Sequence, residues 1–94
     1  MIDVAPRFDT SCKSQLEGEE NTKFSISCCA HGYPPPNVVI YDEQGKIVIN
    51  QTDRAVWTGI LTYQNHQSQY MCIAQNHMGQ ISQNFTLHAF CKLM

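Results

Sequence analysis

The stretch from Tyr70 to Gly79 constrains the fold of this chain more than any other, because it has the pattern of a β-strand that runs into a tight turn. Tyr70, Cys72 and Ala74 recur at the period of two that places side chains on one face of a strand, and the residues between them fall on the other face. The last four residues of the stretch are typical of a tight turn, with Gly79 expected to permit the reversal. Tyr70 and Gly79 are therefore the residues that we expect to define the fold.

The rest of the chain repeats this strand-and-turn pattern. Alternating or β-rich segments are separated by turn residues, and no helical period of useful length occurs. Glu17 to Asn21 and Asp42 to Gly45 are expected to be surface turns. In one segment, Val56 to Tyr63, the pattern does not decide which side chains point inward, because Gly59 and two consecutive apolar residues interrupt the alternation. The pattern predicts an all-β fold with a turn about every 8 to 12 residues, which is typical of a two-sheet sandwich.

Length and charge exclude several classes of protein. The 94 residues suit one domain, residues 1–94 with a core of about 5–91, and the net charge is -2. Because there is no basic run, nucleic acid and anionic membranes are not expected as partners. No apolar run approaches the roughly 18 residues that span a bilayer. The first residues have no basic and apolar leader, so we expect the chain to be a fragment of a longer protein.

The cysteine content favours an oxidising compartment. Five cysteines in 94 residues are many for a cytosolic domain. Two glycosylation sequons agree with this, one beginning at Asn50 (Asn-Gln-Thr) and one at Asn84 (Asn-Phe-Thr). Together these features predict an extracellular or lumenal protein.

Two motifs resemble intermediate-set (I-set) immunoglobulin domains. Cys28-x-Ala30-x-Gly32, followed by three prolines and a β-rich segment, resembles strand B and the B–C loop of that family. Tyr70-x-Cys72-x-Ala74-x-Asn76-x-x-Gly79 resembles its strand F and F–G turn, including the tyrosine corner. The resemblance implies an immunoglobulin-like Greek-key sandwich, with strands A, B, E and D in one sheet and A′, G, F, C and C′ in the other.

The sequence departs from the family pattern at several positions. Ile40 stands where the family has a strand-C tryptophan, and His66 and Ser68 replace the usual residues of the E–F corner. A smaller residue at position 40 would leave space in the core. We hypothesise that Trp57 packs inward and fills part of that space; the alternative is a place on the outer face.

The resemblance also implies the cysteine pairing. Cys28 and Cys72 occupy the positions that the family bridges across the sandwich. Cys91 lies at the end of strand G, beside which strand A′ runs parallel, so Cys12 is a possible partner for Cys91. The remaining Cys29 is expected to be either a free thiol or a bridge to another chain, because an odd number of cysteines cannot all pair internally.

Catalysis and metal binding are not expected. The four histidines fall in expected loops or on an outer face, whereas a zinc site needs four convergent ligands. No third group is available to orient a Cys–His nucleophile pair, and no phosphate-binding loop is present. We therefore predict no catalytic residue, no cofactor and no metal, although the parent protein could be a receptor kinase.

One outer face is the predicted interaction surface. Alternation places several apolar and aromatic residues on the outer side of the G–F–C sheet, where neighbouring strands lie about 4.8 Å apart. Exposed patches of this kind mark interaction sites, and aromatic residues and methionine are enriched in them. The alternative is cover by an adjoining domain or a long loop. The residues predicted to bind a partner are Val39, Tyr41, Met71, Ile73, His88 and Phe90, with Thr86 beside them.

By resemblance, the function is recognition. We expect an extracellular module of a cell adhesion molecule or receptor that binds a protein partner or a second copy of itself. The parent protein is expected to be membrane-anchored and to contain neighbouring immunoglobulin-like domains. The alternative is an intracellular structural link of a muscle or cytoskeletal protein, in which the cysteines would be reduced.

Overall fold

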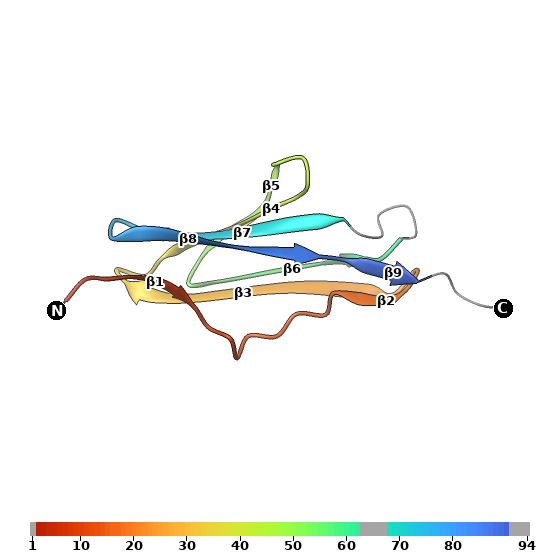
Figure 1. Cartoon of the computed structure of the whole chain (residues 1–94), viewed down its shortest axis with the longest axis horizontal. Coiled ribbons are helices and arrows are strands. Elements are labelled where there is room, and N and C mark those ends of the chain that lie inside the picture. Colours follow the sequence, from red (N-terminus) through yellow and green to blue (C-terminus); the bar gives the residue numbers. More distant parts are fainter. Residues whose placement is uncertain (1, 63–67, 91–94) are drawn as a thin grey trace.

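The chain folds into two layers of β-strands (Figure 1). A computed structural model describes residues 2–62 and 68–90. The strands are β1 (Val4–Phe8), β2 (Glu17–Glu19), β3 (Lys23–Tyr33), β4 (Asn37–Tyr41), β5 (Ile47–Thr52), β6 (Arg54–Ile60), β7 (Gln69–Asn76), β8 (Gly79–Thr86) and β9 (His88–Phe90). The predicted all-β class is confirmed, and the described ranges contain no helix with the length and apolar character needed to cross a membrane.

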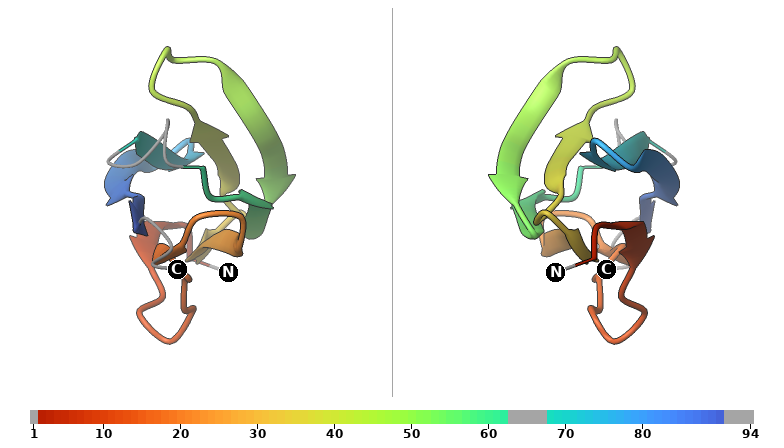
Figure 2. Two further views of the ribbon diagram at one scale, coloured as in Figure 1. Left: turned by 90° about the vertical axis from the view of Figure 1, so that its right-hand side faces the viewer. Right: turned by 90° about the vertical axis from the view of Figure 1, so that its left-hand side faces the viewer.

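The strands form two main sheets and one additional pair. One sheet has the order β1-β3-β6 and the other the order β5-β4-β7-β8, and β2 pairs with β9 in parallel. Figure 2 shows the two layers end-on, with the β4–β5 hairpin rising away from them. The expected strand D is absent from the described residues. The chain leaves β5 and passes through Asp53, which has a φ of 69°, directly into β6 of the opposite sheet.

The core lies between the two layers. The predicted inward set on β3 is confirmed, since Phe24, Ile26, Cys28 and Ala30 are all buried. Ile40 is fully buried opposite Cys72 on the neighbouring strand. The other core residues are Val38, Ala55, Leu61, Ala74, Phe85, Leu87 and Ala89.

The register of β6 shows which of its side chains face the core, a question that the sequence pattern left undecided. Trp57 pairs with Ile26, and because antiparallel partners share a face, the indole points inward. Trp57 is partly buried against the core, so its predicted inward orientation is confirmed. The ring centroids of Tyr70 and Phe24 lie 6.0 Å apart. Burial of Tyr70 raises its pKa. Of the corner that Tyr70 is expected to lock, Asn65 to Gln69, residues 65–67 lie outside the described ranges.

Two expectations about turns need correction. Glu17 to Glu19, predicted as a surface turn, is the strand β2, because its backbone pairs with His88 to Phe90. Gly79 does not provide a left-handed reversal. The chain turns through His77 and Met78, and only Gly45 among the described glycines has a positive φ, of 82°.

Asn76 holds the β7–β8 turn and links it to other segments. Its side-chain oxygen accepts a hydrogen bond from the Met78 backbone N–H at 2.9 Å. Its side-chain nitrogen donates to the carbonyl oxygens of Val4, at 2.8 Å, and of Pro34, at 3.0 Å. Asn76 therefore fixes the start of β1 against the end of the other sheet, a role that the sequence did not reveal.

Candidate functional site

The inner disulfide joins the two sheets. Cys28 on β3 and Cys72 on β7 are bonded across the core, as predicted, and both are buried. They are separated by 44 residues in the sequence. Closing a loop of this length lowers the entropy of the unfolded chain and is worth about 4 kcal/mol. Both sulfur atoms are thus used in stabilising the fold.

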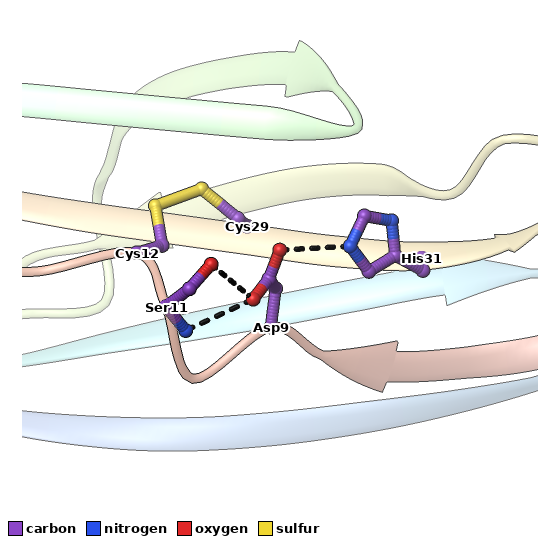
Figure 3. A network of polar contacts seen from close by, with 5 residues as sticks. All are labelled: Asp9, Ser11, Cys12, Cys29 and His31. Atoms are coloured by element: carbon purple, nitrogen blue, oxygen red, sulfur yellow. Dashed lines mark hydrogen bonds and ion pairs between the residues drawn. A yellow bond between two sulfur atoms is a disulfide. The ribbon is translucent and has the colours of Figure 1, made fainter.

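A second disulfide joins Cys12 to Cys29 on the outer side of the β1-β3-β6 sheet (Figure 3). Two predictions are therefore wrong: Cys12 is not bonded to Cys91, and Cys29 is neither a free thiol nor a bridge to another chain. Cys91 itself lies outside the described residues. Four of the five cysteines are paired in two disulfides.

The path of residues 9–14 explains this pairing. β1 ends opposite Ala30, and the backbone N–H of Asp9 then donates to the carbonyl oxygen of Cys29 at 2.9 Å. Further along, the Ser14 hydroxyl accepts a hydrogen bond from the Ser27 N–H at 2.9 Å. Residues 9–14 thus stay beside β3. The chain comes next to β9 only later, where β2 pairs with it. Cys12 therefore meets the outward side chain of Cys29.

A polar network lies beside the outer disulfide (Figure 3). The Asp9 carboxylate accepts hydrogen bonds from the Ser11 hydroxyl at 2.6 Å and the Ser11 N–H at 2.9 Å, and it lies 2.8 Å from Nε2 of His31. The Ser11 bonds, followed by that of His31, lower the pKa of Asp9 to about 2. We call the outward side chains of Asp9, Ser11, Cys12, Cys29 and His31 the cross-linked face.

Two of the histidines each lie beside a different carboxylate. His31 lies beside Asp9, and Nε2 of His77 lies 2.7 Å from the Asp3 carboxylate. His88 is exposed on β9, and His66 falls outside the described residues. In the part of the chain that the structure describes, no three histidine, cysteine or acidic residues converge as metal ligands would.

The outer side of the β5-β4-β7-β8 sheet has a different character. Met71 pairs with Tyr41 on one side and Asn84 on the other, and Tyr41 also pairs with Ile47. The adjacent row contains Asn50, Val39, Ile73 and Ser82 in successive strands. We call these eight residues the open face. Its centre is apolar, and its polar residues lie on the two outer strands.

The predicted interaction surface is only partly assembled. Tyr41, Met71 and Ile73 do lie together, but Val39 is 7% exposed and adds little accessible surface. His88 and Phe90 belong to β9, which pairs with β2. Phe90 lies six residues after Asn84, the residue opposite Met71. That spacing corresponds to about 20 Å along a strand. The prediction of one contiguous patch is therefore wrong for these two residues.

The structure adds Ile47 to this surface. Ile47 is 51% exposed and pairs with Tyr41 across a register shift in β5. Alternation along β5 alone could not place Ile47 on this face. The register shift between Ile49 and Ile47 changes which residues of β5 point outward. Ile47 therefore extends the apolar centre of the open face toward the edge of the sheet.

A shallow groove of about 460 Å³ runs along part of the open face. Its apolar wall includes Tyr41, Met71 and Ile73, whereas Asp42 and Glu43 of the β4–β5 turn supply acidic groups. Asn84 also lines it. The arrangement suits a ligand surface that combines apolar side chains with basic groups.

The architecture is shared with solved immunoglobulin domains. A chimeric titin Z1Z2 structure matches 98% of this chain and all of its own, with a TM-score of 0.78 and 18% identity. The chain has an immunoglobulin-like fold. The tandem immunoglobulin repeats of Dlar match 95% of this domain and 50% of their own chain, with a TM-score of 0.75 and 22% identity.

Sequence relatives come from adhesion molecules. Human intercellular adhesion molecule 5 is 33% identical over 85 residues, which cover 88% of this immunoglobulin-like domain. Mouse intercellular adhesion molecule 5 is 29% identical over 84 residues, also 88% of the chain. The domain spans 8% of the length of each of these curated relatives. No protein-family profile matches the chain.

Proposed function

We propose that this immunoglobulin-like domain is an I-set recognition module from the extracellular part of a cell adhesion molecule or receptor. The observation that carries the proposal is the 33% identity to intercellular adhesion molecule 5 over 88% of the chain. The parent protein is membrane-anchored in this proposal, with neighbouring immunoglobulin-like domains. The domain binds a protein partner or a second copy of itself.

The cysteines support an extracellular location. Both disulfides require an oxidising environment to persist, and the Cys12–Cys29 bond lies on the outer side of a sheet rather than in the core. An intracellular domain of this size would keep such thiols reduced. The sequons at Asn50 and Asn84 agree with passage through the secretory pathway.

The open face is the proposed contact surface. Its centre presents Tyr41, Ile47, Met71 and Ile73 beside the groove, and interface cores are enriched in aromatic residues and methionine. A solved complex of titin domains Z1Z2 with telethonin, matched with a TM-score of 0.77 at 20% identity, is a case of this fold binding a protein. His88 and Phe90 lie on β9, away from the groove, and remain proposed as a separate contact.

A charge substitution on the open face tests this proposal. Ile73→Glu and Tyr41→Glu place a carboxylate at the centre of the proposed contact, and Ile60→Glu is the matched control on β6 of the opposite sheet. Ile60 is 48% exposed, so its replacement changes the charge equally with little cost in packing. For protein produced without N-glycans, we expect concentration-dependent sedimentation of the wild-type domain to show self-association that Ile73→Glu abolishes and Ile60→Glu retains. Identical sedimentation of all variants would contradict self-binding through this face.

The second candidate is an intracellular structural link, which the close fold similarity to titin domains favours. Oxidation state separates the two candidates. Counting free thiols in the natively expressed protein, under denaturing and non-reducing conditions, should give one thiol in the chain if both disulfides are formed. Five free thiols would favour the intracellular link instead.

A further inference from the structure

The two glycosylation sequons project from the same face of the domain. Asn84 on β8 pairs with Met71, and Asn50 on β5 pairs with Val39. Paired residues in antiparallel strands share a face and have Cβ atoms about 5 Å apart. Both asparagines are exposed. Although they lie 34 positions apart in the chain (84 minus 50), the fold brings both onto the open face.

These asparagines lie at opposite corners of the apolar centre. β5 and β8 are the outer strands of the four-stranded sheet, separated by three strand spacings or about 14 Å. Asn84 belongs to the row of Met71, Tyr41 and Ile47, whereas Asn50 belongs to the adjacent row. The apolar side chains therefore lie between the two sequons.

The two positions differ in what they could cover. Val39, opposite Asn50, is already 7% exposed, so a group on Asn50 would hide little apolar surface there. Asn84 instead lines the groove together with Met71 and Ile73, which are only partly buried. A bulky, hydrated group on Asn84 would therefore stand over the apolar wall of the groove.

We propose that Asn84 is N-glycosylated and that its glycan covers the groove, so that the occupancy of this one site controls access to the open face. The inference rests on the proposed extracellular function, because the modification takes place in the secretory pathway. It adds a means of regulation: the face is closed to a protein partner when Asn84 carries a glycan, and open when it does not.

The chemistry requires one co-reactant, an oligosaccharide linked to a lipid pyrophosphate. The side-chain amide nitrogen of Asn84 forms a bond to the anomeric carbon of the first sugar. The bond between that carbon and the phosphate oxygen breaks, and the lipid pyrophosphate leaves with the electron pair. The amide proton passes to the basic group of the transferase, and no group is oxidised or reduced. Thr86 supplies the hydroxyl that completes the sequon.

A matched pair of variants tests the proposal in the whole chain, secreted from mammalian cells behind a signal peptide. Thr86→Ala destroys the sequon, whereas Thr86→Ser preserves it, and both remove the same methyl group. Mass spectrometry is expected to find a glycan on Asn84 in the wild type and in T86S, and none there in T86A. Absence of the glycan from the wild type and from T86S would overturn the proposal.

The covering of the groove is measured by oxidation of Met71. Peroxide converts accessible methionine to the sulfoxide. We expect Met71 to be oxidised several-fold faster in T86A than in T86S. Met78, which is 49% exposed in the β7–β8 turn about 20 Å away along the strand, should react at the same rate in both. Equal rates at Met71 would overturn the proposed cover.

Two further measurements test whether the change in the Met71 oxidation rate is due to the glycan on Asn84. Native removal of the glycan from the wild-type protein by a peptide N-glycosidase should raise the Met71 rate as T86A does, without a substitution at Thr86. Thr52→Ala, which removes the sequon of Asn50, should raise it much less. An equal rise in T52A would contradict the particular role of Asn84.

These outcomes are separate from those that test the proposed function. A secreted protein without a glycan on Asn84 would refute the inference and leave recognition through the open face intact. Reduced cysteines in the natively expressed protein would refute the extracellular function, whatever the glycosylation of the chain when it is forced through the secretory pathway.

Discussion

The two outer surfaces of the sandwich are built in opposite ways. On the cross-linked face, residues 9–14 are held against β3 by the Cys12–Cys29 disulfide, the Asp9–His31 ion pair and the hydrogen bonds of Ser14. On the open face, side chains from four strands lie next to one another with an apolar centre, and neither of the two disulfides of the described residues crosses them.

The difference separates stability from recognition within one small domain. The cross-linked face uses covalent and polar bonds to hold an irregular segment, which has few backbone partners of its own. The open face rests on a regular sheet whose backbone is already paired, so its outward side chains are free to serve a contact. Changes on the two faces are therefore expected to have different consequences, and the following predictions test this contrast.

Among changes on the two outer faces, the largest effect on stability is expected from the outer disulfide. Replacing both Cys12 and Cys29 by alanine removes a cross-link between residues 17 apart in sequence, which is worth about 3 kcal/mol. Urea unfolding should therefore show a lower midpoint for the double variant. On the open face, the matched change Ile47→Ser should alter the free energy of unfolding by less than about 0.5 kcal/mol, because this side chain is exposed. Equal midpoints for the wild type and the double cysteine variant would remove the proposed contrast.

A smaller effect is expected from Asn76, which links the sheets that carry the two faces. Asn76→Ala removes the bonds to the carbonyls of Val4 and Pro34 and should cost about 1–2 kcal/mol. Amide hydrogen exchange should become faster in β1, because the start of that strand loses its anchor. Gln75→Ala, at an exposed neighbouring position, serves as the control and should leave exchange in β1 unchanged.

The smallest effect is expected from Asp9 and depends on pH. The pKa of Asp9 in the folded protein, about 2, is below its ordinary value of 3.8, so folding favours the carboxylate. The stability that this preference contributes is fully present above about pH 4 and is lost as the pH falls toward 2. The difference in unfolding free energy between the wild type and Asp9→Asn should therefore shrink over that interval.

Urea unfolding at several pH values between 2 and 7 measures this difference. Ser11→Ala removes one of the two Ser11 donors and should give a weaker pH dependence of the same sign. A constant difference between the wild type and Asp9→Asn across the acid range would show that the carboxylate does not gain from folding.

The regular strands of the core could be predicted from the sequence. Alternation at Phe24, Ile26 and Cys28 predicted an inward face because a strand places successive side chains on opposite sides. The pairing of Cys28 with Cys72 followed from the family resemblance, which supplied the facing strands that the spacing alone does not. The all-β class and the turn at Asp42 to Gly45 were also predicted correctly.

The candidate site could be predicted only in part. Met71 and Ile73 were placed on the outer side by alternation, but the extent of the surface depends on how strands pair. Phe90 was wrongly included because β9 lies beyond the first residue of β7, Gln69, and pairs with β2. Ile47 was missed because a register shift changes the phase of β5. Strand pairing and register are set by contacts between distant segments, and a local sequence pattern does not contain this information.

The sequence by itself thus determined which residues face the core and which side of each regular strand carries apolar side chains, because both follow from a period of two. Only the tertiary structure decided the partner of Cys12, the role of Asn76 and the meeting of Asn50 and Asn84 on one face. Each of these depends on the path of an irregular segment or on the register between strands. Those are settled by the packing of the whole chain, since many local arrangements satisfy the same sequence pattern.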